Sequence, residues 1–143
     1  MAITQGMANS FKVHLLSGTK NFNSDTFLLS LYTSSATLGE TTTAYTTSGE
    51  CPSTGNYTAG GNTLTVSVTP TNTGNVAYVS FANTSWTNAT ITANGALIYN
   101  SSRANAAVAV LAFGGDKTST NGTFAVNFPT ADSSSAIIRL TAS

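Results

Sequence analysis

Charge is scarce in this 143-residue chain. Only 7% of its residues are Asp, Glu, Lys or Arg, and five basic residues balance five acidic ones. Soluble domains ordinarily carry about 25% charged residues. Because the chain has no net positive charge, it has no basic field to attract phosphates, which disfavours nucleic acids and anionic membrane surfaces as its main targets. We therefore expect neither a nucleic acid nor a membrane among its partners.

Groups that ligate metals or act as nucleophiles are equally few, with one cysteine, Cys51, and one histidine, His14. A single cysteine cannot close an intramolecular disulfide, and these two residues cannot supply the ligand set of a structural zinc site. A Ser-His-Asp triad would have to use His14, and no Gly-x-Ser-x-Gly motif follows a predicted strand. We expect a protein that is not an enzyme and has no cofactor and no metal site.

Acidic residues are too dispersed to indicate paired carboxylate chemistry. A glycan-cleaving enzyme needs two carboxylates about 5 to 9.5 Å apart on either side of a groove, and a calcium loop needs several in a dense cluster. All five acidic residues instead lie in or near predicted turns, where Asp in particular is favoured. They are Asp25, Glu40, Glu50, Asp116 and Asp132.

Long hydrophobic runs are also missing. No stretch approaches the 18 or more apolar residues typical of a membrane span, and no apolar signal-peptide core follows Met1, so we expect no Sec export. The polar surface must instead consist of hydroxyls and amides from 26 Thr, 18 Ser and 14 Asn. Such a surface is soluble but repels itself only weakly, which indicates a subunit of an assembly.

Apolar residues recur at every fourth position near the N-terminus: Ile3, Met7, Phe11 and Leu15. This spacing places them on one face of a helix, which Thr4 would cap and Gly18 would end. We predict a short amphipathic helix from about Ile3 to Leu16, in an N-terminal helix or arm that covers residues 1–18. A helix of this length is marginal alone, so its apolar face should dock on the domain or on a neighbouring subunit.

The rest of the chain, 19–143, reads as β-structure. Leu64, Val66 and Val68 alternate with polar residues, and 108–113 is continuously apolar, as in a central strand. Gly114–Gly115 reads as a turn. About eight short strands without intervening helical patterns predict a mainly β, single-domain antiparallel β-sandwich of the jelly-roll type with a short N-terminal helix.

Aromatic residues are the remaining candidates for recognition, because their rings offer flat amphipathic faces. Three of them are placed on loops or strand ends, where packing and contact with another chain or ligand are equally plausible. Together with the apolar residues of the predicted helix they form the candidate interface: Ile3, Met7, Phe11, Leu15, Tyr45, Tyr57 and Trp86.

Several segments carry a resemblance. In order they are MAITQ at 1–5, DTFLLSLYTSSATL at 25–38, TAYT at 43–46, YTAGG at 57–61, GALIYN at 95–100, AVAVL at 107–111 and AIIRL at 136–140. As a set, in this order, they resemble a family of small virion structural proteins of tailed bacteriophages. The resemblance covers almost the whole chain.

The resemblance implies a virion component without catalysis. Within it, we expect a capsid decoration (cement) protein that forms a homodimer or homotrimer, is assembled in the host cytoplasm, and binds the phage major capsid protein on the capsid exterior. The alternative is a tail-fibre, tail-tip or head-fibre adhesin module that binds host surface glycans. Copy number separates the two, because a decoration protein covers the capsid lattice in many copies whereas a tail module is present in few.

Overall fold

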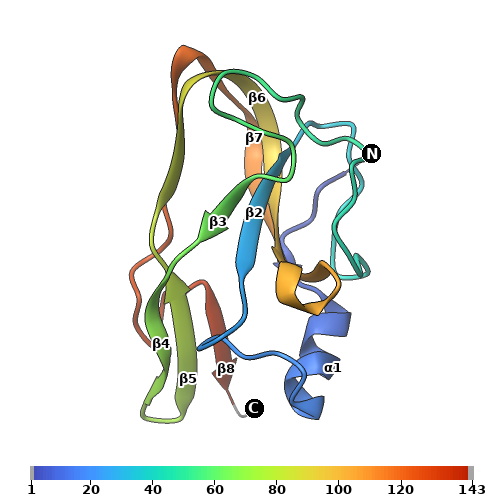
Figure 1. Ribbon diagram of the computed structural model, residues 1–143. Coiled ribbons are helices and arrows are strands. Elements are labelled where there is room, and N and C mark those ends of the chain that lie inside the picture. The colour runs from blue at the N-terminus through green and yellow to red at the C-terminus, as the bar shows by residue number, and fades with distance from the viewer. Residues whose placement is uncertain (1, 142–143) are drawn as a thin grey trace.

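Two antiparallel β-sheets and one short α-helix make up the fold in the computed structural model, which describes residues 2–141 (Figure 1). The predicted β-sandwich with a short N-terminal helix is confirmed. The larger sheet has the order β1 (Gly6–Met7), β7 (Ala106–Val126), β6 (Thr84–Asn100), β2 (Phe27–Tyr32) and β3 (Asn62–Leu64). The smaller sheet has the order β4 (Val66–Thr73), β5 (Val76–Phe81) and β8 (Ile138–Thr141).

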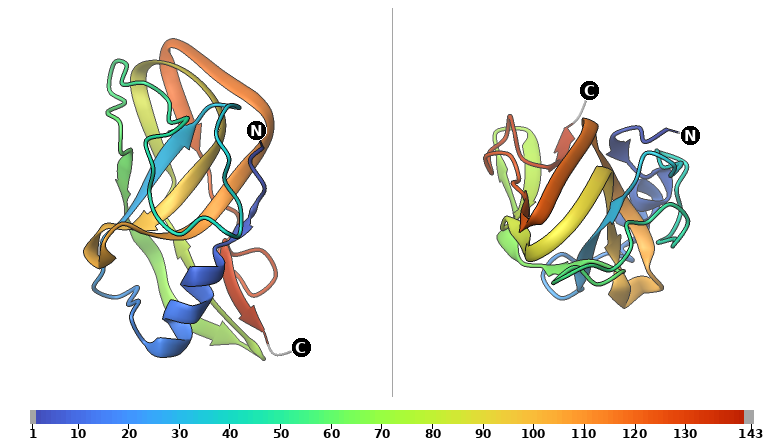
Figure 2. Two further views of the ribbon diagram at one scale, coloured as in Figure 1. Left: turned by 90° about the vertical axis from the view of Figure 1, so that its right-hand side faces the viewer. Right: turned by 90° about the horizontal axis from the view of Figure 1, so that it is seen from above.

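Strands β6 and β7 form one long, curved hairpin that rises above the rest of the molecule (Figures 1 and 2). The sequence predicted several short strands here, but they merge across register shifts within the ladder. The predicted turn at Gly114–Gly115 is wrong, because both residues lie inside β7. Residues 113–116 stand opposite Asn94 alone, and positive φ angles of 76° and 148° at the two glycines let β7 bend there.

The alternating run around Leu64 and Val66 was predicted as one strand but belongs to two sheets. Strand β3 pairs with β2, whereas β4 pairs with β5 after the chain passes Thr65. The Thr65 carbonyl accepts a hydrogen bond from the Ala82 N–H at 2.8 Å. The alternating segment is therefore extended, as predicted. Its backbone, however, passes from the larger sheet to the smaller sheet between Leu64 and Val66 and forms a corner of the sandwich.

The N-terminal helix α1 (Asn9–Ser17) begins later than predicted and ends at the predicted Gly18. Residues before Asn9 are extended: Ile3 forms a bridge with Leu38, and β1 pairs with β7. The Thr4 N–H donates to the Leu38 carbonyl, so Thr4 does not cap a helix. The apolar spacing predicted a longer helix. The segment before Asn9 instead pairs with β7 and so satisfies N–H and C=O groups on the edge of β7, which a helix in the same place would leave without partners.

Aromatic packing joins α1 to the sandwich. The Phe22 and Phe27 rings stack with centroids 4.7 Å apart, and Phe11 of α1 meets Phe22 edge-on at 5.9 Å. Phe81 of β5 packs against both Phe22 and Phe27. One side of the helix thus docks on the core of its own chain, and the opposite side stays at the surface.

Candidate functional site

Three residues of the candidate interface are buried within the chain itself. Phe11, Tyr57 and Trp86 are 0%, 1% and 2% exposed. Tyr57 and Trp86 meet edge to face with centroids 5.3 Å apart. Their prediction as contacts for another chain is wrong, because a side chain without accessible surface cannot bury further area. The sequence placed Trp86 at a strand end, but β6 continues through it and turns the ring into the core.

The other four candidates, Ile3, Met7, Leu15 and Tyr45, are half-buried and pack against the core. Tyr45 stacks on Tyr99 with centroids 4.7 Å apart, which gives it a structural role. Leu15 lines an open groove, described below. The interface role of these four residues stays a prediction.

Three large apolar side chains that the spacing argument did not select are exposed at the surface of the described residues. Leu16 is 91% exposed, Val13 is 63% exposed and Leu140 of β8 is 48% exposed. Leu15 and Leu16 are neighbours on a helix, so they cannot both face the core. This Leu-Leu pair was the available signal for a second apolar face. Val13 and Leu16 lie on α1 and Leu140 lies on β8, the two elements that border the groove described next, and we call these three exposed residues together the exposed apolar face.

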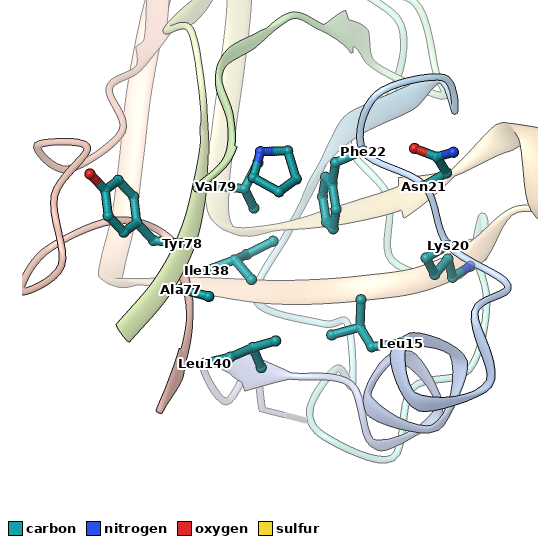
Figure 3. A pocket seen from close by; sticks show the side chains of 10 residues that line it. Leu15, Lys20, Asn21, Phe22, Ala77, Tyr78, Val79, Ile138 and Leu140 are labelled. Atoms are coloured by element: carbon teal, nitrogen blue, oxygen red, sulfur yellow. The ribbon is translucent and has the colours of Figure 1, made fainter. Parts of the chain in front are cut away.

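An apolar groove of about 240 Å³ separates α1 from the smaller sheet (Figure 3). Leu15 approaches it from the helix and Leu140 from β8, and Ile138 and Ala77 also line it on the side of the smaller sheet. Its remaining lining residues are Lys20, Asn21, Phe22, Pro70, Tyr78 and Val79. The groove and the exposed apolar face share Leu140, so this end of the molecule presents both an apolar hollow and apolar projections.

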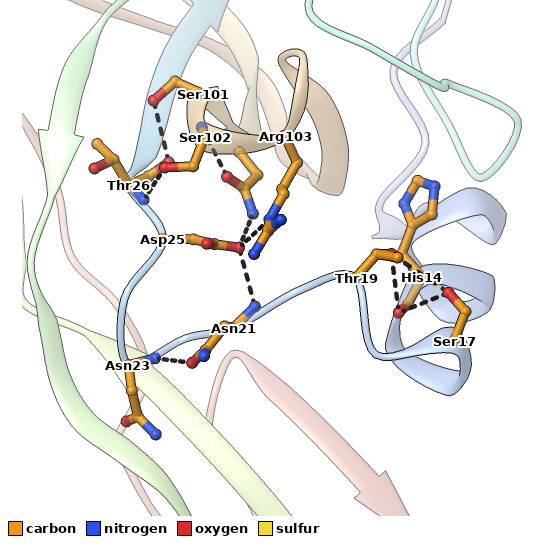
Figure 4. A network of polar contacts seen from close by, with 11 residues as sticks. His14, Ser17, Thr19, Asn21, Asn23, Asp25, Thr26, Ser101, Ser102 and Arg103 are labelled. Atoms are coloured by element: carbon orange, nitrogen blue, oxygen red, sulfur yellow. Dashed lines mark hydrogen bonds and ion pairs between the residues drawn. The ribbon is translucent and has the colours of Figure 1, made fainter.

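A polar network centred on Asp25 lies to one side of the helix (Figure 4). The Asp25 Oδ2 atom accepts hydrogen bonds from the Arg103 Nε at 3.1 Å, the Asn100 Nδ2 at 2.8 Å and the Asn21 N–H at 3.0 Å. Burial by itself would raise the pKa of Asp25, but these hydrogen bonds and the Arg103 charge hold it below its usual value. The network ties the segment after α1 to the 3₁₀ helix η1 (Ser101–Arg103).

A second hollow of about 400 Å³ lies along β7. The half-buried Phe113 ring and Phe124 form its apolar part, and Lys117, Thr118, Thr123 and Asn127 add polar groups. Ala125 and Val126 complete the lining. A ring beside hydroxyl and amide groups is a combination that suits a sugar.

The carboxylate of Glu50 holds the long connection between β2 and β3 in place. Its Oε1 accepts from the Tyr45 hydroxyl at 2.5 Å, and its Oε2 accepts from the Tyr57 hydroxyl at 2.9 Å and from the Gly60 N–H at 2.5 Å. Tyr57 in turn accepts from the Leu31 N–H of β2 at 3.0 Å. Both carboxylate oxygens are engaged, so this cluster anchors a loop and presents no free acid.

Alkaline pH is expected to unfold the protein through these buried phenols. Tyr32 of β2 is a third such phenol, and its hydroxyl donates to the Thr46 carbonyl in the same connection. Burial is the main cause that raises the pKa of Tyr32 to about 12, and it also raises the pKa values of Tyr45 and Tyr57. An unfolded tyrosine ionises near pH 10, so the stabilisation is complete below about pH 10 and is lost as the pH rises through about 12. Denaturant titrations followed by Trp86 fluorescence across this range should show the decline. Phenols that ionise near pH 10 while the protein stays folded would contradict it.

Cys51 is expected to be unreactive in the native protein. Its side chain is 2% exposed, its Sγ lies 3.3 Å from the Thr92 carbonyl, and burial followed by the nearby Glu50 charge raises its pKa to about 11. Only about one thiol in a thousand would then be a thiolate near pH 8. A thiol-specific chromogenic reagent should label Cys51 in denaturant and not in buffer. Rapid labelling in buffer would show that the loop opens.

Within residues 2–141, no three His, Cys, Asp or Glu side chains gather as a metal site would require. Over the same residues, no helix combines the length and apolar character needed to cross a membrane. Comparison with protein-family models, with curated proteins and with solved structures finds no match to this chain.

Proposed function

We propose that this chain is a non-enzymatic structural subunit of a tailed-phage virion, and that it acts as a capsid decoration (cement) protein. In this role it associates with itself as a homodimer or homotrimer and binds the major capsid protein on the capsid exterior. The observation that carries the proposal is the exposed apolar face beside the apolar groove. Leu16, at 91% exposure, contributes nothing to the stability of a solitary chain through burial.

Burial of this face offers a simple source of binding energy. Removing apolar surface from water contributes roughly 25 cal/mol per Å², less the cost of ordering the partners. With 7% charged residues, the chain has few ions to desolvate when two surfaces meet. A contact repeated over a lattice multiplies this modest gain, which suits a cementing role.

Copy number in the particle tests the proposal. Quantitative mass spectrometry of purified virions should find this chain in numbers comparable with the major capsid protein, and immunogold labelling should decorate the heads. A few copies confined to the tail, or absence from the particle, would overturn the proposal.

Substituting Leu16 is expected to weaken self-association without unfolding the chain. Leu16→Gln exchanges an exposed apolar side chain for a polar one of similar helix propensity, while Leu16→Met keeps it apolar. Because burying a leucine contributes about 1.5 to 3 kcal/mol, Leu16→Gln should weaken association about tenfold or more. Sedimentation velocity over a concentration series measures this. Equal association by both variants, or a wild-type protein that stays monomeric at high concentration, would contradict the role of this face.

The second hollow favours one alternative, a tail-fibre, tail-tip or head-fibre adhesin module that binds host glycans. Phe113 would supply a stacking ring, and Thr118, Thr123 and Asn127 would supply hydrogen bonds to sugar hydroxyls. A glycan array probed with the wild type and with Phe113→Ala separates the candidates. Binding that requires Phe113 supports the adhesin, and no binding by the wild type removes it.

A further inference from the structure

We propose that Lys20, His14 and Arg103 form a binding site for a single oxyanion group, such as a carboxylate or a phosphate, beside the C-terminal end of α1. The site does not depend on the proposed virion function. Three observations support it. Lys20 is a buried cation without a hydrogen-bond partner, a small hollow lies next to it, and the nearby Asp25 carboxylate makes its hydrogen bonds to other residues.

The buried cation is Lys20. This residue is 9% exposed, and its Nζ atom is buried without a hydrogen-bond partner in the chain. The side chain also lines the apolar groove, and Figure 3 shows its nitrogen directed away from the groove residues. A buried ammonium without a partner costs several kcal/mol, and an oxyanion would remove that cost.

The hollow is small, and the four side chains that bound it present carbon atoms as well as polar groups to it. It measures about 170 Å³ and is bounded by His14, Thr19, Lys20 and Arg103. The Nδ1 atom of His14 is buried and also lacks a hydrogen-bond partner. Two residues that carry a buried nitrogen atom without a partner, His14 and Lys20, thus line one hollow that has room for a small oxyanion once their side chains turn toward it.

Local charge favours an anion in this hollow. Asp25 is the carboxylate that acts on Lys20, but its Oδ2 is shared among Arg103, Asn100 and Asn21, and it makes no hydrogen bond to Lys20 Nζ. One carboxylate therefore faces two cations, Lys20 and Arg103. Burial lowers the pKa of Lys20, and the Asp25 charge only partly opposes this. A bound anion would complete the charge balance.

The end of α1 does not repel the anion as strongly as its position suggests. Carbonyl groups at a helix C-terminus carry partial negative charge. The His14 carbonyl, however, accepts from the Thr19 N–H at 3.0 Å and from the hydroxyls of Ser17 and Thr19 at 3.2 Å each (Figure 4). These hydrogen bonds partly offset the negative end of the His14 carbonyl dipole, which lessens its repulsion of an anion.

The test is an NMR titration of backbone amides with sodium phosphate and, separately, sodium acetate, each against sodium chloride at equal ionic strength. Saturable shifts should appear around residues 14–20 and 103. Lys20→Met keeps the aliphatic stem but removes the charge, and it should weaken binding about tenfold or more, because a hydrogen bond to a charged group contributes about 1.5 to 3 kcal/mol. Lys12→Met, at a half-exposed lysine that pairs with Glu40 and lines neither hollow, should bind as the wild type does.

Thermal unfolding gives a second readout that a merely structural lysine would not produce. In chloride, Lys20→Met should melt no lower than the wild type, because it removes an unpartnered buried charge. Phosphate should raise the melting temperature of the wild type and of Lys12→Met by more than it raises that of Lys20→Met, since non-specific salt effects act on all three alike. Equal phosphate binding by Lys20→Met and the wild type, or shifts that do not saturate, would overturn the site.

The oxyanion can come from solution or from an acidic side chain of a neighbouring subunit. Light scattering in phosphate and in chloride distinguishes these sources. If phosphate dissociates wild-type oligomers but not those of Lys20→Met, the natural occupant is a carboxylate of the partner. If phosphate binds without affecting association, the occupant is a free anion.

Discussion

Replacing Gly55 by alanine is expected to prevent the chain from reaching its native fold. A Cβ atom at this position would lie 1.7 Å from the Asn88 carbonyl oxygen, which belongs to the backbone of β6 and cannot rotate away. Relieving the overlap requires moving the 54–57 turn off the sheet. We expect a loss of more than about 5 kcal/mol, comparable with the whole stability of a small domain.

Gly74 provides the matched control. Its φ of 58° is close to the 54° of Gly55, but a Cβ there would meet no atom within 4 Å. Gly74→Ala therefore isolates the cost of the left-handed backbone conformation, about 1 to 2 kcal/mol. Urea titrations followed by circular dichroism should show a folded, slightly weakened Gly74→Ala and an unfolded Gly55→Ala. Similar losses in both variants would mean that the turn can move away from β6 at little cost.

The turn matters because it places Tyr57. Thr54 and Tyr57 exchange backbone hydrogen bonds of 2.9 and 2.8 Å across it. The Tyr57 ring then enters the core against Trp86, and its hydroxyl reaches Glu50. A displaced turn would therefore remove an aromatic contact and a charged hydrogen bond together.

Truncating Glu50 is the second substitution with a large expected effect. Glu50→Ala leaves the hydroxyls of Tyr45 and Tyr57 and the Gly60 N–H without their acceptor. Because hydrogen bonds to a charged group contribute about 1.5 to 3 kcal/mol each, and water can replace some of them, we expect a loss of about 3 to 5 kcal/mol. Denaturant titration gives the value, and faster proteolysis within 33–61 would locate the damage.

Glu40 is the natural control, since it is the same residue type in a different setting. It pairs with Lys12 at 3.3 Å, and both side chains are about half exposed. Glu40→Ala should cost less than about 1 kcal/mol, as is usual for surface ion pairs. If Glu40→Ala and Glu50→Ala destabilise equally, the Glu50 cluster does not anchor the loop.

The fold class was predictable because short sequence patterns indicate whether each segment forms a strand or a helix. Period-two alternation and the absence of helical spacing after Gly18 predicted β-structure, and apolar residues at every fourth position before Gly18 predicted a short helix. The bend of β7 at Gly114–Gly115 was not predictable from the sequence, which indicated a turn there. Whether two glycines end a strand or bend it depends on the partner strand, and β6 lies some 20 residues earlier in the chain.

The candidate site was less accessible to prediction than the fold. Leu15 was identified through its spacing, but Phe11 satisfies the same spacing and is buried. Lys20 and Arg103 gave no signal, since their meeting depends on Asp25 and η1 being brought together across the sandwich. Leu16 is exposed because α1 docks on the core through Phe11. That orientation depends on tertiary contacts, which the helix sequence alone does not specify.

The short length of β1 has a consequence for how copies of the chain can grow into larger structures. Among the described residues, β1 covers only Val110 and Ala109 on the outer edge of β7, and the Gln5 side chain accepts from the Ala112 N–H beyond them. Further along, the irregular residues 113–116 and the charged Lys117 interrupt the flat ladder that an incoming strand would need. Addition of a strand from another copy along this edge is thereby discouraged, so a copy that meets the molecule here would have to bind through side chains.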